Sequence, residues 1–346
     1  MSQLASLPPS GVVRFVDNAH AEVPMDLRGV DLPGAELLGA ARTLLARHPE
    51  AGAHPARLVR VAGLGADTWV LDETSQVTGS FKVRGALLAL ERLLATGVRE
   101  VIAASAGNHG AGVAHAAKVL GMKATIVVPR GTPEKKLSNI RGAGATLVVH
   151  DVAGYDAAEA FAMEWSAKDG IPFLSAYDDV AVVAGNGASL GYELLDLAAT
   201  HPLEGATVLV PFGGGGLATG LATVLGPRGF RVLGVESEVS PAMALSLERD
   251  AAQTTLEPEG ETWAEGLEGG IATAAFARAR AAVDGIYVVS ESKVRAAMGW
   301  LHRAGITCEG SAALAILPVA AVRAAFPGPI VVLLTGRNVD AARLVG

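Results

Sequence analysis

The amino-acid sequence predicts an α/β protein with two lobes, each built on a mainly parallel sheet flanked by helices. Half of the 346 residues are apolar and 18% are charged, which is typical of a folded chain with a sizeable core. Short apolar runs alternate with amphipathic stretches of roughly 10–15 residues, a pattern that indicates strands joined by crossover helices. Because the alternation occurs in two series, we expect two lobes with a cleft between them.

The first series follows an irregular beginning. Pro8, Pro9, Pro24 and Pro33 interrupt the first ~55 residues, and we expect a single helix there, at about 34–47. The series then predicts strands at 68–71, 101–104, 124–128 and 146–149. It predicts helices at 86–94, 110–120, 133–140 and 155–168. Gly121 and Gly170 follow two of these helices at the position where helices commonly end.

The second series occupies the rest of the chain. It predicts strands at 207–210, 231–235, 287–289 and 330–334. It predicts helices at 217–225, 292–303 and 311–325. Neither series contains a fixed-period repeat or a low-complexity linker.

Composition excludes several classes of partner. The net charge is −7 and no basic cluster is present, which argues against nucleic acid. The single cysteine, Cys308, excludes an internal disulfide framework and fits a reducing cytosol. No secretory signal is recognisable in the first 16 residues, and no apolar run of about 18 residues predicts a membrane span. We therefore expect a cytoplasmic protein without membrane or nucleic-acid partners.

Lys82 lies in the segment Thr78-Gly-Ser-Phe-Lys-Val-Arg-Gly-Ala86, between a strand and a strong helix. A turn at 78–80 places this lysine near the start of the helix. The positive end of the helix and partial burial both favour a neutral amine, which is the form that imine formation requires. Considered alone, Lys82 is more simply interpreted as a solvated surface lysine.

A second segment, Ser105-Ala-Gly-Asn-His-Gly110, follows a buried strand and opens a helix. The first backbone N–H groups of a helix have no partner within it, so they can bind an anion. Considered alone, Asn108 is better explained as an ordinary helix cap.

A glycine-rich loop, Pro211-Phe-Gly-Gly-Gly-Gly-Leu217, lies between a strand and a helix. Successive N–H groups without side chains can wrap a phosphate. A nicotinamide dinucleotide site uses a similar loop with an acidic residue about 20 positions further on. Glu236 lies 20 positions after Gly216, so a dinucleotide-dependent oxidoreductase stays open as an alternative.

Taken together, these three segments resemble the fold-type II pyridoxal-phosphate family, whose fold is similar to the tryptophan synthase β subunit. Within that family the resemblance is to threonine/serine dehydratases (ammonia-lyases) and serine racemases, from about Asp67 to Asp340. It implies pyridoxal 5'-phosphate as cofactor, with Lys82 holding it as a Schiff base and Phe81 packed beside its ring. It also implies a large cofactor domain (56–98 and 179–346), a small domain that binds the substrate carboxylate (99–178) and an extension (1–55) packed on the large domain.

The resemblance assigns further site residues. The phosphate is expected on Gly213, Gly214, Gly215 and Gly216, with Leu217 beside them. Asn108 is expected on the ring oxygen, Thr335 on the pyridine nitrogen and Glu309 near the active site. The substrate carboxylate is expected on Ser105, Ala106, Gly107, Asn108 and His109, and Ser105 is also a candidate catalytic residue. Considered alone, Thr335 could simply satisfy a backbone carbonyl.

Two substitutions refine the expected activity. Similar racemases carry a second serine where this sequence has Ala106, and alanine has no proton to deliver, so we expect little racemisation. Similar racemases also have a divalent-cation site. In this sequence Ala242 stands at the second acidic position of that site, so we expect no metal.

The resemblance predicts α,β-elimination of a small 3-hydroxy amino acid, such as L-threonine or L-serine, to a 2-oxo acid and ammonia. A neutral hydroxyl at Thr335 cannot keep the pyridine nitrogen protonated, which favours elimination over transamination. One alternative is β- or γ-replacement, as in threonine synthase or cysteine synthase, although those relatives usually carry aspartate where this chain has Val83. Another is a non-catalytic protein that binds the cofactor or an amino acid. We expect a homodimer.

Overall fold

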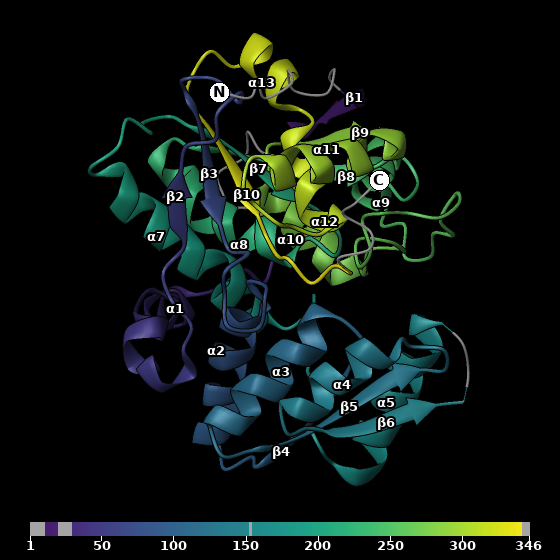
Figure 1. The fold of residues 1–346 in the computed structure, drawn as a ribbon. Helices are drawn as coiled ribbons and strands as arrows, with labels where there is room; N and C mark the ends of the chain where they lie inside the picture. Colours follow the sequence, from purple (N-terminus) through teal and green to yellow (C-terminus); the bar gives the residue numbers. More distant parts are fainter. Residues whose placement is uncertain (1–10, 20–29, 152–153, 341–346) are drawn as a thin grey trace.

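The computed structural model of the chain describes residues 11–19, 30–151 and 154–340. Its strands form two separate sheets, one in each lobe (Figure 1). None of the helices formed by these residues has both the length and the apolar composition of a membrane span. The predicted fold class, two lobes with mainly parallel sheets and flanking helices, is confirmed.

The larger sheet has seven strands in the order β1-β9-β8-β7-β10-β3-β2. The strands are β1 (Val12–Asp17), β2 (Arg57–Val59), β3 (Thr68–Asp72), β7 (Thr207–Pro211), β8 (Arg231–Ser237), β9 (Gly285–Val289) and β10 (Ile330–Leu334). The five inner strands are parallel, whereas the edge strands β1 and β2 run antiparallel to β9 and β3. β10 lies between β3 and β7. This late strand therefore connects β2 and β3 to the strands from β7 to β1 in the same sheet.

Alternate residues of the inner strands pack into different cores. In β10, Val331 and Leu333 face one apolar cluster, while Ile330, Val332 and Leu334 face another. All five residues are fully buried. A sheet covered on both faces needs apolar residues at every position, which explains why these strands read as continuous apolar runs.

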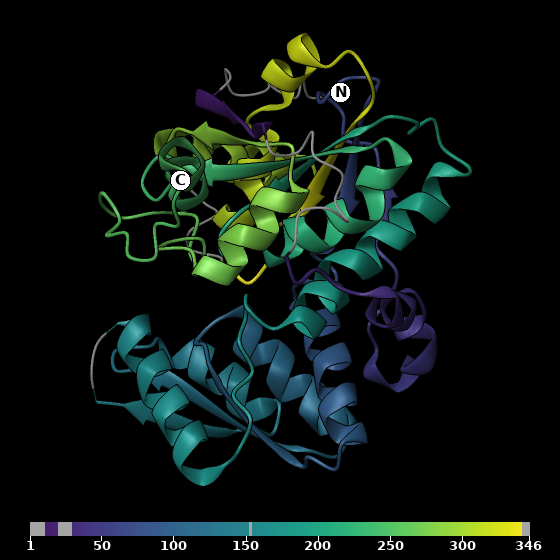
Figure 2. The same cartoon turned by 180° about the vertical axis from the view of Figure 1, so that it is seen from behind.

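The smaller sheet contains three parallel strands, β4 (Glu100–Ala104), β5 (Lys123–Pro129) and β6 (Thr146–His150). Its helices are α3 (Asn108–Val119), α4 (Glu134–Gly142) and α5 (Tyr155–Asp169). Figure 2 shows this lobe from behind, apart from the larger sheet. Helix α2 (Lys82–Ala95) packs against α3 and thereby links the lobe to β3.

The other helical segments pack around the larger sheet or beside α2 and α3. They are α1 (Ala35–Arg47), η3 (Pro49–Ala51), α6 (Val180–Val183), η4 (Ala184–Ala188), α7 (Ser189–Ala198), α8 (Gly216–Leu225), η5 (Gly226–Arg228), α9 (Ala242–Arg249), α10 (Thr273–Ala282), α11 (Glu291–Arg303), α12 (Gly310–Ala313), η6 (Leu314–Ile316) and α13 (Val319–Ala325). The η4 segment is one π-helical turn between α6 and α7.

Two expectations from the sequence are wrong. The single helix expected at 311–325 is divided into α12, η6 and α13. Pro318 stands immediately before α13 and has no N–H to continue the preceding turn. The beginning of the chain is also less irregular than expected, because β1 forms there by pairing with β9.

Candidate active site

Lys82 is the first residue of α2 and follows the turn after β3. The N–H of Phe81 donates to the carbonyl of Thr335 at 3.0 Å, and the N–H of Arg337 donates to the carbonyl of Gly79 at 2.8 Å. Gly79 has φ +76°, and a side chain there would overlap the amide of Asn338. The turn before Lys82 is therefore fixed by the segment that follows β10.

The amine of Lys82 lies among apolar and aromatic groups. Burial lowers the pKa of Lys82 to about 8, and the charge of Glu309 partly opposes this shift. Nζ donates to the carbonyl of Ala176 at 3.3 Å and lies 4.8 Å from the ring centroid of Tyr177. A sizeable fraction of this amine is neutral near pH 7.5, so it can act as a nucleophile or a base.

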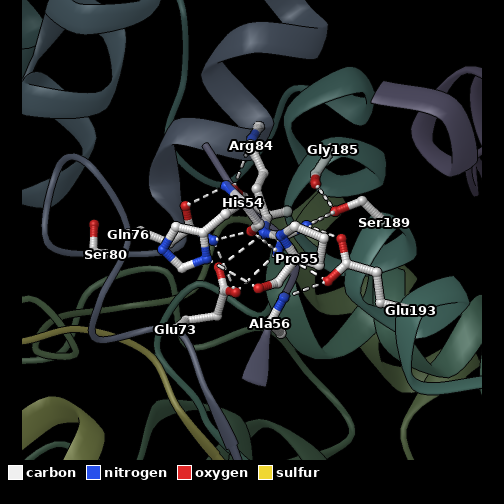
Figure 3. Close-up of polar contacts among 12 residues, drawn as sticks. His54, Pro55, Ala56, Glu73, Gln76, Ser80, Arg84, Gly185, Ser189 and Glu193 are labelled. Atoms are coloured by element: carbon white, nitrogen blue, oxygen red, sulfur yellow. Dashed lines mark hydrogen bonds and ion pairs between the residues drawn. The ribbon is translucent and has the colours of Figure 1, made fainter. Parts of the chain in front are cut away.

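Arg84, two residues after Lys82, anchors the first turn of α2 (Figure 3). Its side chain is fully buried, and its guanidinium donates to both carboxylate oxygens of Glu73 at 2.8 and 2.9 Å. It also donates to both oxygens of Glu193 in α7, at 2.7 and 3.0 Å. These charge-assisted bonds tie α2 to the end of β3 and to α7. Neither Arg84 nor its two glutamate partners were predicted to have a role.

The segment from Ser105 to Gly110 joins β4 to α3. A side chain at Gly110 would overlap the carbonyl oxygen of Ser105, so the sharp turn requires glycine at this position. The hydroxyl oxygen of Ser105 accepts the N–H of Gly107 at 3.1 Å. Gly107 is exposed and Ala106 is partly buried. The free N–H groups at the start of α3 can bind a carboxylate here.

The ring of His109 forms a hydrogen bond within the protein, which leaves the backbone N–H as the group that could bind the expected carboxylate. Nε2 donates to the carbonyl of Leu174 at 3.0 Å. Burial and, secondarily, the charge of Lys82 lower the pKa of His109 to about 3, so the ring is neutral. Within the described part of the chain, Nδ1 is buried and has no hydrogen-bond partner. The imidazole therefore has no second N–H to offer a carboxylate.

Asn108 connects the two lobes. Its Nδ2 donates to Oε1 of Glu309 at 2.7 Å, and its Oδ1 accepts from Nδ2 of Asn338 at 2.6 Å. Burial raises the pKa of Glu309 to about 7, against the hydrogen bond from Asn108. The next residue, Gly310, leaves no space for a side chain because Cβ would overlap the carbonyl of Trp263. Asn338 was not predicted as a site residue, and no sequence pattern distinguishes it.

The glycine loop connects β7 to α8. Gly215 has φ +80°, and Cβ there would lie 2.8 Å from the ring of Phe212. Cβ at Gly214 would overlap the ring of Tyr177, and Cβ at Gly213 would lie 3.1 Å from Leu267. Gly216 begins α8, and the side chain of Leu217 packs into the core of the large lobe. The loop thus presents backbone without side chains at the start of a ten-residue helix.

The predicted site residues are linked through a chain of contacts. The carbonyl of Thr335 is bonded to Phe81, Lys82 lies beside Tyr177, and Tyr177 packs against Gly214. Tyr177 and Ala176 were not predicted, because they lie in a segment where no strand or motif was recognised.

No group of three or more potential metal ligands occurs among the residues that the structure describes. Glu236, at the end of β8, accepts the N–H groups of Met243 and Ala244 at 2.8 and 2.9 Å.

Comparison with known proteins agrees with this geometry. Residues 50–336 match the family described as "Pyridoxal-phosphate dependent enzyme". An L-threonine ammonia-lyase of Thermotoga maritima is 33% identical over 284 residues, which cover 80% of this chain and 68% of that protein. The chain therefore belongs to the family of pyridoxal-phosphate dependent enzymes, as the sequence predicted.

Solved structures show the same relationship. A threonine deaminase from T.th. has a TM-score of 0.78 and 35% identity, over 89% of this chain and 99% of that one. A threonine deaminase isoform 2 from Solanum lycopersicum has a TM-score of 0.81 and 28% identity, over 98% of this chain and 97% of that one.

The described residues fit the cofactor of this family. The loop from Gly213 to Gly216 has no side chains that would cover its N–H groups, and it lies at a helix start, where a phosphate is favoured. Tyr177 connects this loop to the Lys82 amine. Ser80, two residues before the lysine, has a buried hydroxyl without a hydrogen-bond partner among the described residues. A buried polar atom without a partner is consistent with a ligand-binding region.

Proposed function

We propose that the protein eliminates water from a small 3-hydroxy amino acid, such as L-threonine or L-serine. The resulting enamine takes the water up again on hydrolysis, so the net products are a 2-oxo acid and ammonia. The observation that carries this proposal is the Lys82 amine, which has a pKa lowered to about 8 and lies 4.8 Å from the ring centroid of Tyr177, the residue that packs on the glycine loop. Relatives with 33% and 34% identity bear the names L-threonine ammonia-lyase and L-threonine dehydratase.

Each part of the site has a task in this proposal. Gly213 to Gly216 would hold the cofactor phosphate, Lys82 would hold its aldehyde carbon, and Asn108 and Thr335 would contact its ring. When bound, pyridoxal phosphate supplies an electron-withdrawing ring that stabilises negative charge at the substrate Cα. The N–H groups that begin α3 orient the substrate carboxylate. The Lys82 amine takes the proton from Cα.

Ala106 limits the reaction to one face of the substrate. Lys82 accepts the proton on its own side, and a methyl group at position 106 cannot return a proton on the other. We therefore propose elimination without significant racemisation.

We further propose that the enzyme is a cytoplasmic homodimer. The single, buried cysteine fits a reducing cytosol, and light scattering of the purified protein tests the dimer.

The test is a substrate screen with the purified enzyme. We expect 2-oxo acid and ammonia from L-threonine, L-serine or a related 3-hydroxy amino acid. Lys82→Ala should abolish both products and the borohydride-trapped cofactor adduct, because no other amine replaces Nζ. Lys118→Ala, an exposed lysine on α3, is the matched control and should retain both.

The alternatives give different outcomes in the same screen. A replacement enzyme would require an added nucleophile and release little ammonia from a hydroxy amino acid. A non-catalytic binding protein would form the adduct on Lys82 without turnover. D-serine formation at a rate comparable to elimination would contradict the role given to Ala106.

A further inference from the structure

The amine of Lys82 contacts a segment, 174–177, to which the proposed reaction gives no task. This segment leaves the small sheet beside β4, where the N–H of Leu174 donates to the carbonyl of Ile102 at 2.8 Å. Two residues apart, the carbonyls of Leu174 and Ala176 accept hydrogen bonds from His109 and Lys82. One segment therefore positions side chains from the first turns of both α3 and α2.

The ring of Tyr177 lies between Lys82 and the glycine loop. Its centroid is 4.8 Å from Nζ, which is within the range of a cation–π interaction. On the loop side the ring occupies the space that a Gly214 side chain would need, and the Tyr177 carbonyl oxygen is 3.5 Å from a Cβ built on Gly216. Tyr177 cannot move far without disturbing the loop.

The residues after Tyr177 are firmly held. Arg278 of α10 forms an ion pair with the carboxylate of Asp178 and donates to its carbonyl at 3.2 Å. The carboxylate of Asp179 accepts the N–H of Ala181 at 2.8 Å and caps α6. The positions of Ala176 and Tyr177 are thus determined by the surrounding protein, independently of Lys82.

We propose that the Ala176 carbonyl and the Tyr177 ring form the resting position of the free Lys82 side chain, and that Tyr177 is a positioning residue for the amine. This inference rests on the proposed function, in which Lys82 would be released from the cofactor when substrate binds and its free amine takes the Cα proton. The freed Nζ then takes the Cα proton and becomes an ammonium, while the electron pair of the C–H bond stays on the substrate. A carbonyl oxygen and an aromatic face both attract an ammonium, so they keep it near Cα.

Other groups that act on Lys82 do not replace this contact. Glu309, at the start of α12, raises the pKa of Lys82 through its charge. His109 of α3 is neutral and carries no charge toward the amine. The ring of Phe81 lies further from Nζ, at 5.3 Å, and belongs to the turn before α2. The contribution of Tyr177 can therefore be measured by changing its ring alone.

The test measures the pKa of Lys82 in the full-length protein after its cofactor has been removed with hydroxylamine. Acetic anhydride labels neutral amines, and peptide mass analysis gives the labelling of Lys82 at each pH. Tyr177→Phe keeps the aromatic face, whereas Tyr177→Met and Tyr177→Leu remove it with different volumes. Tyr192→Met, on α7 and in contact with Arg42, is the matched control at a distant tyrosine–cation pair.

We expect the labelling midpoint to be unchanged in Tyr177→Phe and Tyr192→Met. It should fall by about half to one pH unit in Tyr177→Met or Tyr177→Leu, because the ammonium loses its aromatic partner. The proposal would be overturned if the labelling midpoint of Lys82 were unchanged or higher in a folded Tyr177→Met or Tyr177→Leu protein. The ring would then act only by excluding water. An equal fall in Tyr177→Phe would also overturn it, by assigning the effect to the hydroxyl.

A second measurement uses the loaded enzyme with the substrate identified in the screen. Loss of the ring should lower kcat about tenfold with little change in KM, because Lys82 is free only after substrate has bound. An unchanged kcat, or a rise in KM alone, counts against the positioning role. If the parent enzyme shows no turnover, the proposed function fails, and the labelling midpoints still report separately on the resting position.

Discussion

At the residue scale, His109 makes the folded state sensitive to acid. Its ring is buried and neutral, with a pKa near 3, whereas in the unfolded chain a histidine titrates near 6.5. Between these values the unfolded state binds more protons than the folded state. The contribution of His109 to the free energy of unfolding is therefore fully present above pH 6.5, and it is lost as the pH falls toward 3.

This sign gives a stability prediction for His109→Gln, which can still donate to the carbonyl of Leu174. Between pH 7.5 and pH 5, the parent should lose about 2 kcal/mol more unfolding free energy than the variant, measured by urea denaturation. His302→Gln, an exposed histidine in α11, should follow the parent at both pH values. Equal losses in the parent and His109→Gln would show that the imidazole is not held neutral.

At the element scale, α2, η4 and α8 approach one another through glycines. The N–H of Gly85 donates to Oδ1 of Asn186 at 2.9 Å, and Cβ at Gly185 would lie 2.7 Å from Cα of Gly85. Cβ at Gly220 would overlap the carbonyl of Val183 and lie 2.8 Å from Cα of Gly187. These contacts fix α8, and thus the glycine loop at its start, relative to the helix that begins with Lys82.

Gly220→Ala should therefore destabilise the protein by about 2–3 kcal/mol, because main-chain atoms, which cannot rotate away, occupy the space for the methyl group. Gly39→Ala, at an exposed position in α1 with nothing within 4 Å of Cβ, is the matched control. It should stabilise by up to about 1 kcal/mol through helix propensity. Thermal or urea unfolding of both variants measures this difference. A Gly220→Ala protein as stable as the parent would mean that the helices can separate without cost.

The same elements show what sequence reasoning can recover. Inner strands such as β7, β8 and β10 were predicted because burial on both faces leaves an unmistakable apolar run. The edge strand β1 was missed because its pairing with β9 is a tertiary contact that its own residues do not determine. The segment from α6 to α7 was also missed, since Ala-Gly-Asn-Gly-Ala has low helix propensity and is helical here through close packing.

The residues of the candidate site also divide into those that the sequence reveals and those that it does not. Lys82, Asn108 and the glycine loop lie in short contiguous segments, so their chemistry could be recognised from the sequence. Tyr177 and Asn338 acquire their contacts only when distant segments meet, and neither stands in a recognisable pattern. His109 was recognised, but the direction of its ring depends on the carbonyl of Leu174, which is distant in sequence.

At the scale of the whole molecule, groups from both lobes converge on one site. Asn108 of the small lobe bonds to Glu309 and Asn338 of the large lobe. At the exposed surface, Lys136 of α4 pairs with Glu265 at 3.0 Å, again between the lobes. An exposed pair of this kind contributes little to stability, so the partly buried bond from Asn108 to Glu309 is the stronger of these connections.

A cofactor held by both lobes should consequently stabilise the whole fold. Removing pyridoxal phosphate is expected to lower Tm by several degrees, because a ligand present at a hundredfold to thousandfold excess over its Kd contributes about 3–4 kcal/mol. Differential scanning calorimetry of stripped and reloaded protein measures this change. Pyridoxal without its phosphate should restore less of the Tm, since it cannot use the N–H groups between Gly213 and Gly216. Lys82→Ala should gain less from the cofactor than the parent does, because it forms no covalent bond. If pyridoxal and pyridoxal phosphate restored Tm equally, the glycine loop would not be the phosphate site.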